Sequence, residues 1–114
     1  FENETLEAIN ATRKSKGLKS VVKNPTLDKI AEVFTETVLK KESITSASIR
    51  DQFIKNNLSY KAAFVLNGTS PNNTKIIEES TKQINSTHSQ WAEAGIKYTV
   101  DAFGTLVFVI LYTN

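Results

Sequence analysis

The chain has 114 residues, a net charge of +2 and no cysteine. Hydrophobic residues make up 39% of it and charged residues 23%, as in an ordinary globular domain, so we expect one domain over residues 1–114. The 14 basic and 12 acidic residues are interspersed and form no basic cluster, which argues against nucleic-acid binding. The absence of cysteine excludes disulfides and thiolate metal sites.

Two amphipathic helices are predicted in the first third of the chain. The first covers about residues 3–16, with Asn3 as its predicted N-cap and Gly17 as its stop. The second follows Pro25, and Thr26 is its expected cap. Apolar side chains recur along the second helix at helical spacing, which predicts one buried stripe. They are Leu27, Ile30, Ala31, Phe34 and Val38.

A third helix and a strand are predicted in the middle of the chain. The helix runs from residue 46 or 48 to residue 56, and Ser48 with Asp51 resembles a capping box. A short strand over residues 60–66 follows. Residues 67–72 are rich in turn-forming types, which predicts a loop there.

The last part of the chain predicts a fourth helix from about Asn73 and then a β-hairpin. Residues 96–100 alternate between apolar and polar, and residues 101–104 form the turn, with Phe103 exposed at its tip. Residues 106–112 are apolar on both faces, so helices must cover both sides of that strand. We therefore predict an α+β domain, a three-layer α/β/α sandwich with about four helices around a small, mainly antiparallel sheet.

Several segments, together covering nearly the whole chain, carry short motifs in a characteristic order. Residues 6–18 carry a leucine, an isoleucine–asparagine pair, an arginine and a glycine–leucine pair, and residues 24–31 carry a leucine followed by an apolar residue and an alanine. Residues 85–88 read asparagine-serine-threonine-histidine, and residues 95–113 open on a glycine and form the predicted hairpin. These segments resemble, in this order, the opening, the next segment, the asparagine-serine-proline-glycine-histidine stretch and the closing strands of bacterial members of the CAP superfamily, the cysteine-rich secretory, antigen 5 and pathogenesis-related 1 proteins.

The resemblance implies an extracellular or outer-surface location. The cysteine-free, Asn- and Lys-rich style looks like that of outer-surface lipoproteins of spirochaetes such as Borrelia. The longest apolar run, residues 106–112, is too short to span a bilayer, so we expect membrane attachment only through a lipid anchor upstream of Phe1. The resemblance also implies a host protein or a lipid- or sterol-like molecule as partner, and we expect a monomer.

The chain departs from the family where its functional residues lie. Many members line a cleft with two histidines and two acidic residues, which can hold a divalent metal, but this chain has one histidine, His88. The family's glycine-glutamate-asparagine strand motif is replaced by the apolar residues 62–66. The resemblance therefore implies a non-catalytic domain with no catalytic residues and no cofactor.

Four residues are candidates for the remaining cleft: His88, Ser86, Trp91 and Glu79. The alternative function, a degenerate metal-dependent hydrolase or protease, would use His88 with Glu78 or Glu79. A transition metal needs three or four ligands, so we expect no metal site. Ser86 and His88 are two residues apart and diverge on a helix, which suits a nucleophile–base pair poorly. Trp91 is either an exposed anchor for a partner or a lid on the core.

Two polar residues of the first helix have structural roles implied by the resemblance. Asn10 and Arg13 lie three residues apart and would anchor the helix against a neighbouring loop. We expect the Arg13 stem to be buried with its guanidinium group hydrogen-bonded, and not to form a ligand clamp.

Overall fold

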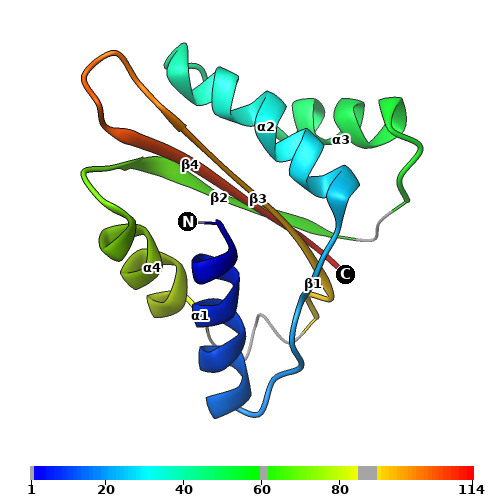
Figure 1. Ribbon diagram of the computed structural model, residues 1–114. Coiled ribbons are helices and arrows are strands. Elements are labelled where there is room, and N and C mark those ends of the chain that lie inside the picture. Colours follow the sequence, from blue (N-terminus) through cyan, green and yellow to red (C-terminus); the bar gives the residue numbers. More distant parts are fainter. Residues whose placement is uncertain (1, 60–61, 85–89) are drawn as a thin grey trace.

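The computed structural model describes residues 2–59, 62–84 and 90–114 (Figure 1). No helix among these residues combines the length and the apolar character needed to cross a membrane. The elements in chain order are α1 (Glu2–Ser15), β1 (Val22–Lys23), α2 (Pro25–Leu39), α3 (Ser46–Lys55), β2 (Ala63–Ser70), α4 (Asn73–Lys82), β3 (Glu93–Val100) and β4 (Leu106–Thr113).

The strands form one mixed sheet in the order β1-β3-β4-β2. β3 and β4 pair as an antiparallel hairpin, and β2 pairs antiparallel with the other side of β4. The short β1 runs parallel to β3. The predicted α+β class with a mainly antiparallel sheet is confirmed, whereas β1 was not predicted.

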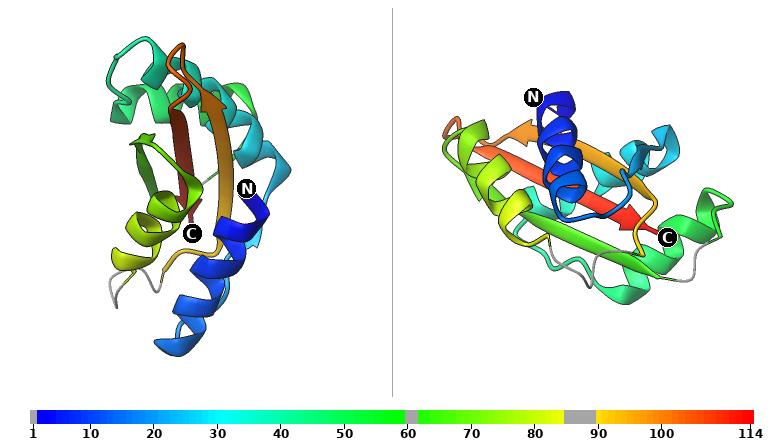
Figure 2. Two further views of the ribbon diagram at one scale, coloured as in Figure 1. Left: turned by 60° about the vertical axis from the view of Figure 1, so that its left-hand side comes forward. Right: turned by 90° about the horizontal axis from the view of Figure 1, so that it is seen from below.

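Helices cover both faces of the sheet (Figures 1 and 2). Successive side chains of β4 enter opposite cores, as the alternation of a strand requires. Phe108 and Ile110 pack in the core beneath α1 and α4, and Val109 and Leu111 pack in the core beneath α2 and α3. The prediction that residues 106–112 are covered on both sides is thereby confirmed.

The first two helices begin earlier than predicted. α1 starts at Glu2, so Asn3 lies inside the helix and does not cap it. α2 is capped by Asn24, whose side-chain oxygen accepts a hydrogen bond from the backbone N–H of Thr26 at 2.9 Å. Pro25 lacks an N–H and therefore suits the first helical position, which places the cap before it and Thr26 inside the helix.

The third helix has a capping box one turn before the predicted one. The Thr45 hydroxyl accepts from the Ser48 backbone N–H at 3.1 Å, and the Ser48 hydroxyl accepts from the Thr45 backbone N–H at 2.9 Å. The predicted pairing of Ser48 with Asp51 is wrong, because Ser48 is the third residue of the helix and acts as the reciprocal partner.

The strand β2 continues beyond its predicted range, the first two residues of which, 60 and 61, lie outside the described residues. Residues 67–70, predicted as a loop, continue the strand and pair with β4 up to Ser70 opposite Leu106. Pairing along a central apolar strand outweighs the local turn preference of Asn67 and Gly68. α4 begins at Asn73 as predicted, since the Asn72 side chain accepts from a backbone N–H of its first turn.

The helix α2 approaches β3 most closely at Gly95. A Cβ atom at this position would lie 2.2 Å from the carbonyl carbon of Leu27, so the helix can pack here only on a glycine. Gly104 in the β3–β4 turn has a φ of 80°, a left-handed conformation that glycine adopts without strain.

Candidate functional site

The sequence-predicted cleft residues do not form one group in the described part of the chain. His88 and Ser86 lie outside the described residues. Glu79 and Glu78 are exposed on α4, and Glu78 is ion-paired with Lys75 at 3.7 Å. Within residues 2–59, 62–84 and 90–114, no three His, Cys, Asp or Glu side chains are close enough together to share a metal ion. The alternative of a hydrolase that uses His88 with Glu78 or Glu79 stays a prediction.

Trp91 is a buried core residue, which corrects its interpretation as an exposed anchor. Only 6% of its surface is exposed. Its ring stacks on Phe64 and Tyr112, with centroid distances of 6.2 and 6.3 Å. Its indole Nε1 is buried without a hydrogen-bond acceptor. The ring lies in the core beneath α1 and α4, so the alternative interpretation of Trp91 as a lid on the core describes it.

Asn10 and Arg13 hydrogen-bond α1 to the loop that follows it and to the segment that leads into β3. The Asn10 side chain donates to the Val21 carbonyl at 3.0 Å and accepts from the Val21 N–H at 2.8 Å. Arg13 is 1% exposed and donates to the carbonyls of Lys19 at 2.6 Å and Trp91 at 3.1 Å. Burial lowers the pKa of Arg13. Both side chains thus hold backbone groups inside the fold.

A hollow of about 440 Å³ lies between β2 and α4, and we call it the β2–α4 hollow. Leu66, Gly68, Ile76 and Phe108 supply the apolar part of its lining. Gly68 pairs directly with Phe108 of the central strand, and a Cβ atom at Gly68 would lie 3.4 Å from the Phe108 ring, an ordinary contact distance. The missing side chain at Gly68 therefore leaves space over this ring.

Polar groups surround this apolar floor. Among the described lining residues, Lys75 and Glu79 are the charged ones, one of each sign. Gln83 adds an amide, and the Ser70 hydroxyl also lines the hollow. The Ser70 hydroxyl donates to the Asn72 carbonyl at 2.9 Å. An apolar floor with a few polar groups at its edge suits an amphipathic small molecule.

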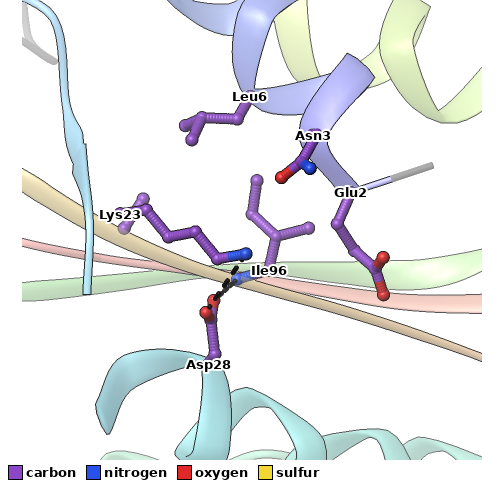
Figure 3. Close-up of a pocket in the computed structure, with 7 residues that line it drawn as sticks. Glu2, Asn3, Leu6, Lys23, Asp28 and Ile96 are labelled. Carbon is purple, nitrogen blue, oxygen red and sulfur yellow. Dashed lines mark hydrogen bonds and ion pairs between the residues drawn. The ribbon is translucent and has the colours of Figure 1, made fainter. Parts of the chain in front are cut away.

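A second, much narrower hollow lies between α1, α2, β1 and β3 (Figure 3). Asp28 reaches across it, accepting from the Ile96 N–H at 2.9 Å and pairing with Lys23 at 3.6 Å. Glu2 accepts a longer hydrogen bond, 3.4 Å, from the Tyr98 N–H. Little open space remains between these side chains. We therefore interpret this hollow as a set of polar contacts that connect neighbouring elements, and not as a ligand site.

Tyr98 joins β3 to both helices on its face. Its hydroxyl donates to the Asn73 side chain at 2.8 Å and is hydrogen-bonded to Thr5, which is fully buried. Burial raises the pKa of Tyr98 to about 12; the nearby charges of Glu2 and Glu4 also raise it, and the Thr5 hydrogen bond lowers it. These hydrogen bonds hold α1 and α4 against the same face of the sheet. The β2–α4 hollow lies between α4 and β2.

The hairpin tip carries a third, smaller hollow of about 240 Å³ between α2 and the β3–β4 turn. Val38, Leu39 and Val107 supply apolar lining, and Phe103 stands at its edge with 92% of its surface exposed. The sequence predicted this exposure, because turn tips project into solvent. Neither the hollow at this tip nor the β2–α4 hollow was predicted.

No family model and no curated protein sequence matches the chain. Among solved structures, a cysteine-rich secretory protein from Staphylococcus aureus aligns with a TM-score of 0.79 and 22% identity, over 98% of this chain and 37% of its own. An outer surface protein from Borrelia burgdorferi aligns with a TM-score of 0.80 and 16% identity, over 98% of this chain and 90% of its own.

An extracellular protein from Bacillus anthracis that contains an SCP domain aligns with a TM-score of 0.67 and 10% identity, over 99% of this chain and 41% of its own. The chain thus spans well under half the length of two of these proteins and most of the length of the Borrelia protein. At these identities the likeness concerns the fold alone. This chain therefore has the CAP-like fold that its sequence predicted.

Proposed function

We propose that this domain is a non-catalytic binding module that holds the apolar part of a small amphipathic molecule in the β2–α4 hollow. The observation that carries the proposal is the hollow itself, about 440 Å³ with Gly68 and Phe108 in its floor and Lys75 and Glu79 at its edge. Ligand sites in proteins have this size range and this division between apolar lining and few polar groups.

The groups around the hollow favour binding over catalysis. A hydrolytic site needs a nucleophile within reach of a base and an oriented third group. In the described lining, the Ser70 hydroxyl donates to the Asn72 carbonyl, and β2 contributes no acidic residue. Lys75 and Glu79 are placed to fix a polar headgroup, while Leu66, which is only partly buried, would contact its apolar part.

An extracellular or surface location is part of the proposal. The three similar structures are a secretory protein, an outer surface protein and an extracellular protein. A domain on a cell surface would meet lipid- or sterol-like molecules and host proteins directly. We extend the proposal to attachment through a lipid anchor upstream of residue 1.

The test is direct titration of the purified domain with palmitate and with cholesterol, followed by calorimetry. A ligand that binds the native state stabilises it, by about 2.7 kcal/mol at a concentration of about 100 times Kd. We expect binding of at least one probe. Gly68→Val should abolish it without unfolding the domain, because the added side chain occupies the hollow and valine suits a strand.

The control is Thr99→Val on β3, which puts the same valine side chain on a strand two positions away from β2 by replacing a hydroxyl with a methyl group. It should leave binding unchanged. Equal binding by wild type and Gly68→Val would remove the hollow as the site, and no binding of either probe by the wild type would remove the proposed function.

A further inference from the structure

The outer side of β2 is an open sheet edge. β2 is the last strand in the order β1-β3-β4-β2 and pairs with β4 along its whole length, from Ala63 opposite Thr113 to Ser70 opposite Leu106. No strand lies on its other side in the described chain, and Figure 2 shows β2 at the outside of the sheet. Asn67 and Thr69 are exposed on it. Unpaired backbone groups of such an edge can pair with another strand.

This edge lacks the side chains that usually prevent such pairing. Proteins protect sheet edges with charged residues, prolines, bulges or a covering segment. Residues 62–70 contain no charged residue and no proline. The edge of β3 is different, because β1 covers its first part and Asp28 and Glu2 accept the N–H groups of Ile96 and Tyr98 beyond β1.

We infer that β2 pairs with β2 of a second copy of this chain, antiparallel and across a two-fold axis. The sheets of the two copies would then form one continuous sheet of twice the number of strands. This inference replaces the monomer expected from the sequence. It goes beyond the proposed binding function and does not require it, although a second copy seated at the β2–α4 hollow and a bound small molecule would compete for the same space.

The residue order of β2 favours a second copy as the occupant. Its first half contains the bulky Phe64 and Leu66, and its second half contains Gly68 and Ser70 on the same face. An antiparallel pair of identical strands, centred near Leu66 or Asn67, places the bulky half of each copy beside the small half of the other. Bulky residues of one copy would then lie at the β2–α4 hollow of its partner, where Gly68 leaves space.

The area of this edge sets the strength of the dimer. An eight-residue strand is about 26 Å long. Pairing along one edge of this length makes a small contact compared with the roughly 1,600 Å² that standard specific interfaces bury in total. The net charge of +2 per copy opposes association only weakly. We therefore expect a weak, concentration-dependent dimer.

Sedimentation equilibrium without any ligand tests this inference, over protein concentrations from about 10 μM to about 1 mM. The wild type should shift from monomer to dimer within that range. Asn67→Lys puts like charges close together at the centre of the pairing and should weaken dimerisation more than about tenfold. Val100→Lys puts the same charge at an exposed position of the β3 edge and should leave it unchanged.

Backbone hydrogen exchange gives a second measurement that does not depend on a variant. Exchange of β2 amides should slow at the higher protein concentration, while exchange of β3 amides beyond β1 should not change. A wild-type chain that stays monomeric at about 1 mM would overturn the inference. So would a dimer that Val100→Lys weakens as much as Asn67→Lys, or one whose β2 amides gain no protection.

Discussion

The two edges of the sheet differ in which groups pair with the outer backbone of the edge strand. At the β3 edge, β1 supplies a short parallel partner, and its last backbone contact is the Asn24 N–H bonded to the Ala94 carbonyl at 2.9 Å. Beyond that point, Asp28 from α2 and Glu2 from α1 accept backbone N–H groups of β3. At the β2 edge, no described residue performs this role, and the strand itself carries no charge.

The difference shows how edge protection depends on neighbouring helices. Both acceptors at the β3 edge lie in the first turn of a helix, where a carboxylate also interacts favourably with the helix dipole. α4 follows β2 with no acidic residue in its first turn. The β3 edge is therefore closed by groups that stabilise their own helices, and the β2 edge is left available for a ligand or a second strand.

The largest expected effect concerns the glycine on which α2 rests. Gly95→Ala would place a Cβ atom 2.2 Å from the Leu27 carbonyl carbon, so the helix must move away from β3. We expect the free energy of unfolding to fall by more than about 3 kcal/mol, because the clash is with backbone and not with a flexible side chain.

The matched variant on the other edge is Gly68→Ala, whose Cβ atom would lie 3.4 Å from the Phe108 ring. It should change stability by less than about 1 kcal/mol, since that is near an ordinary contact. Urea unfolding measures both variants. Equal losses at the two positions would show that α2 does not rest on β3 as described.

Alkaline pH should also lower the free energy of unfolding, by slightly less than Gly95→Ala. Burial raises the pKa of Tyr112 to about 12, against the opposing influence of Arg13, whereas the ordinary pKa of a tyrosine is about 10. As the pH rises, the Tyr112 hydroxyl therefore loses its proton in the unfolded chain before it does so in the folded chain. The stabilisation by neutral Tyr112 is fully present below pH 10 and is lost as the pH rises towards about 12.

The loss from Tyr112, which is 4% exposed, should reach about 2–3 kcal/mol. Tyr112→Phe should remove that part of the pH dependence, measured by urea unfolding at a series of alkaline pH values. Tyr98 on the β3 side, with its pKa also raised to about 12, should titrate over a similar range. An unchanged pH dependence in Tyr112→Phe would contradict the burial of this hydroxyl.

The carboxylate that closes the β3 edge gives the third prediction. Asp28→Ala removes the acceptor of the Ile96 N–H, the ion pair with Lys23 and a favourable charge at the start of α2. We expect a loss of about 2 kcal/mol, mostly from the hydrogen bond to a charged acceptor. Lys23→Ala removes only the ion pair of a half-exposed lysine and should cost less than about 1 kcal/mol.

Native-state hydrogen exchange separates the two variants. In Asp28→Ala the Ile96 amide should exchange much faster, and in Lys23→Ala it should remain protected. If Asp28→Ala left the Ile96 amide protected, another group would be its acceptor.

The elements that the sequence predicted well are those whose pattern is local. The stripe of α2 and the doubly apolar β4 each follow a single period over many residues, and both lie where predicted. β1 was missed because its two residues, Val22 and Lys23, are exposed and owe their conformation to pairing with β3, about 70 residues away in the chain. Residues 67–70 were misassigned for the same reason, because their pairing partner is distant in sequence.

The candidate site was harder to predict than the fold. The sequence directed attention to polar residues such as His88, and of its candidates Glu79 does line the β2–α4 hollow, but the floor of the hollow consists of residues that look like ordinary core in a sequence. A glycine within a strand often marks a close approach or an empty space, but Gly68 was assigned to a predicted loop, where glycine is ordinary, so this signal was missed. The hollow itself arises only when Gly68, Ile76 and Phe108 come together from three elements.

The smallest expected effect compares the asparagines that begin the helices next to each edge. Asn72 caps α4 after β2, and Asn24 caps α2 after β1. Asn72→Asp should raise the free energy of unfolding by about 0.5 kcal/mol, because α4 has no acidic residue in its first turn to compete for the positive end of the dipole. Asn24→Asp should give almost no gain, because Asp28 already supplies that charge and repels a second one.

Thermal unfolding at low salt measures the stability of both variants. The gain at Asn72 should shrink as salt is added, since screening weakens a surface charge–dipole interaction. A larger gain at Asn24 than at Asn72 would mean that Asp28 does not already supply this charge to α2, and the contrast between the two edges would then rest on backbone pairing alone.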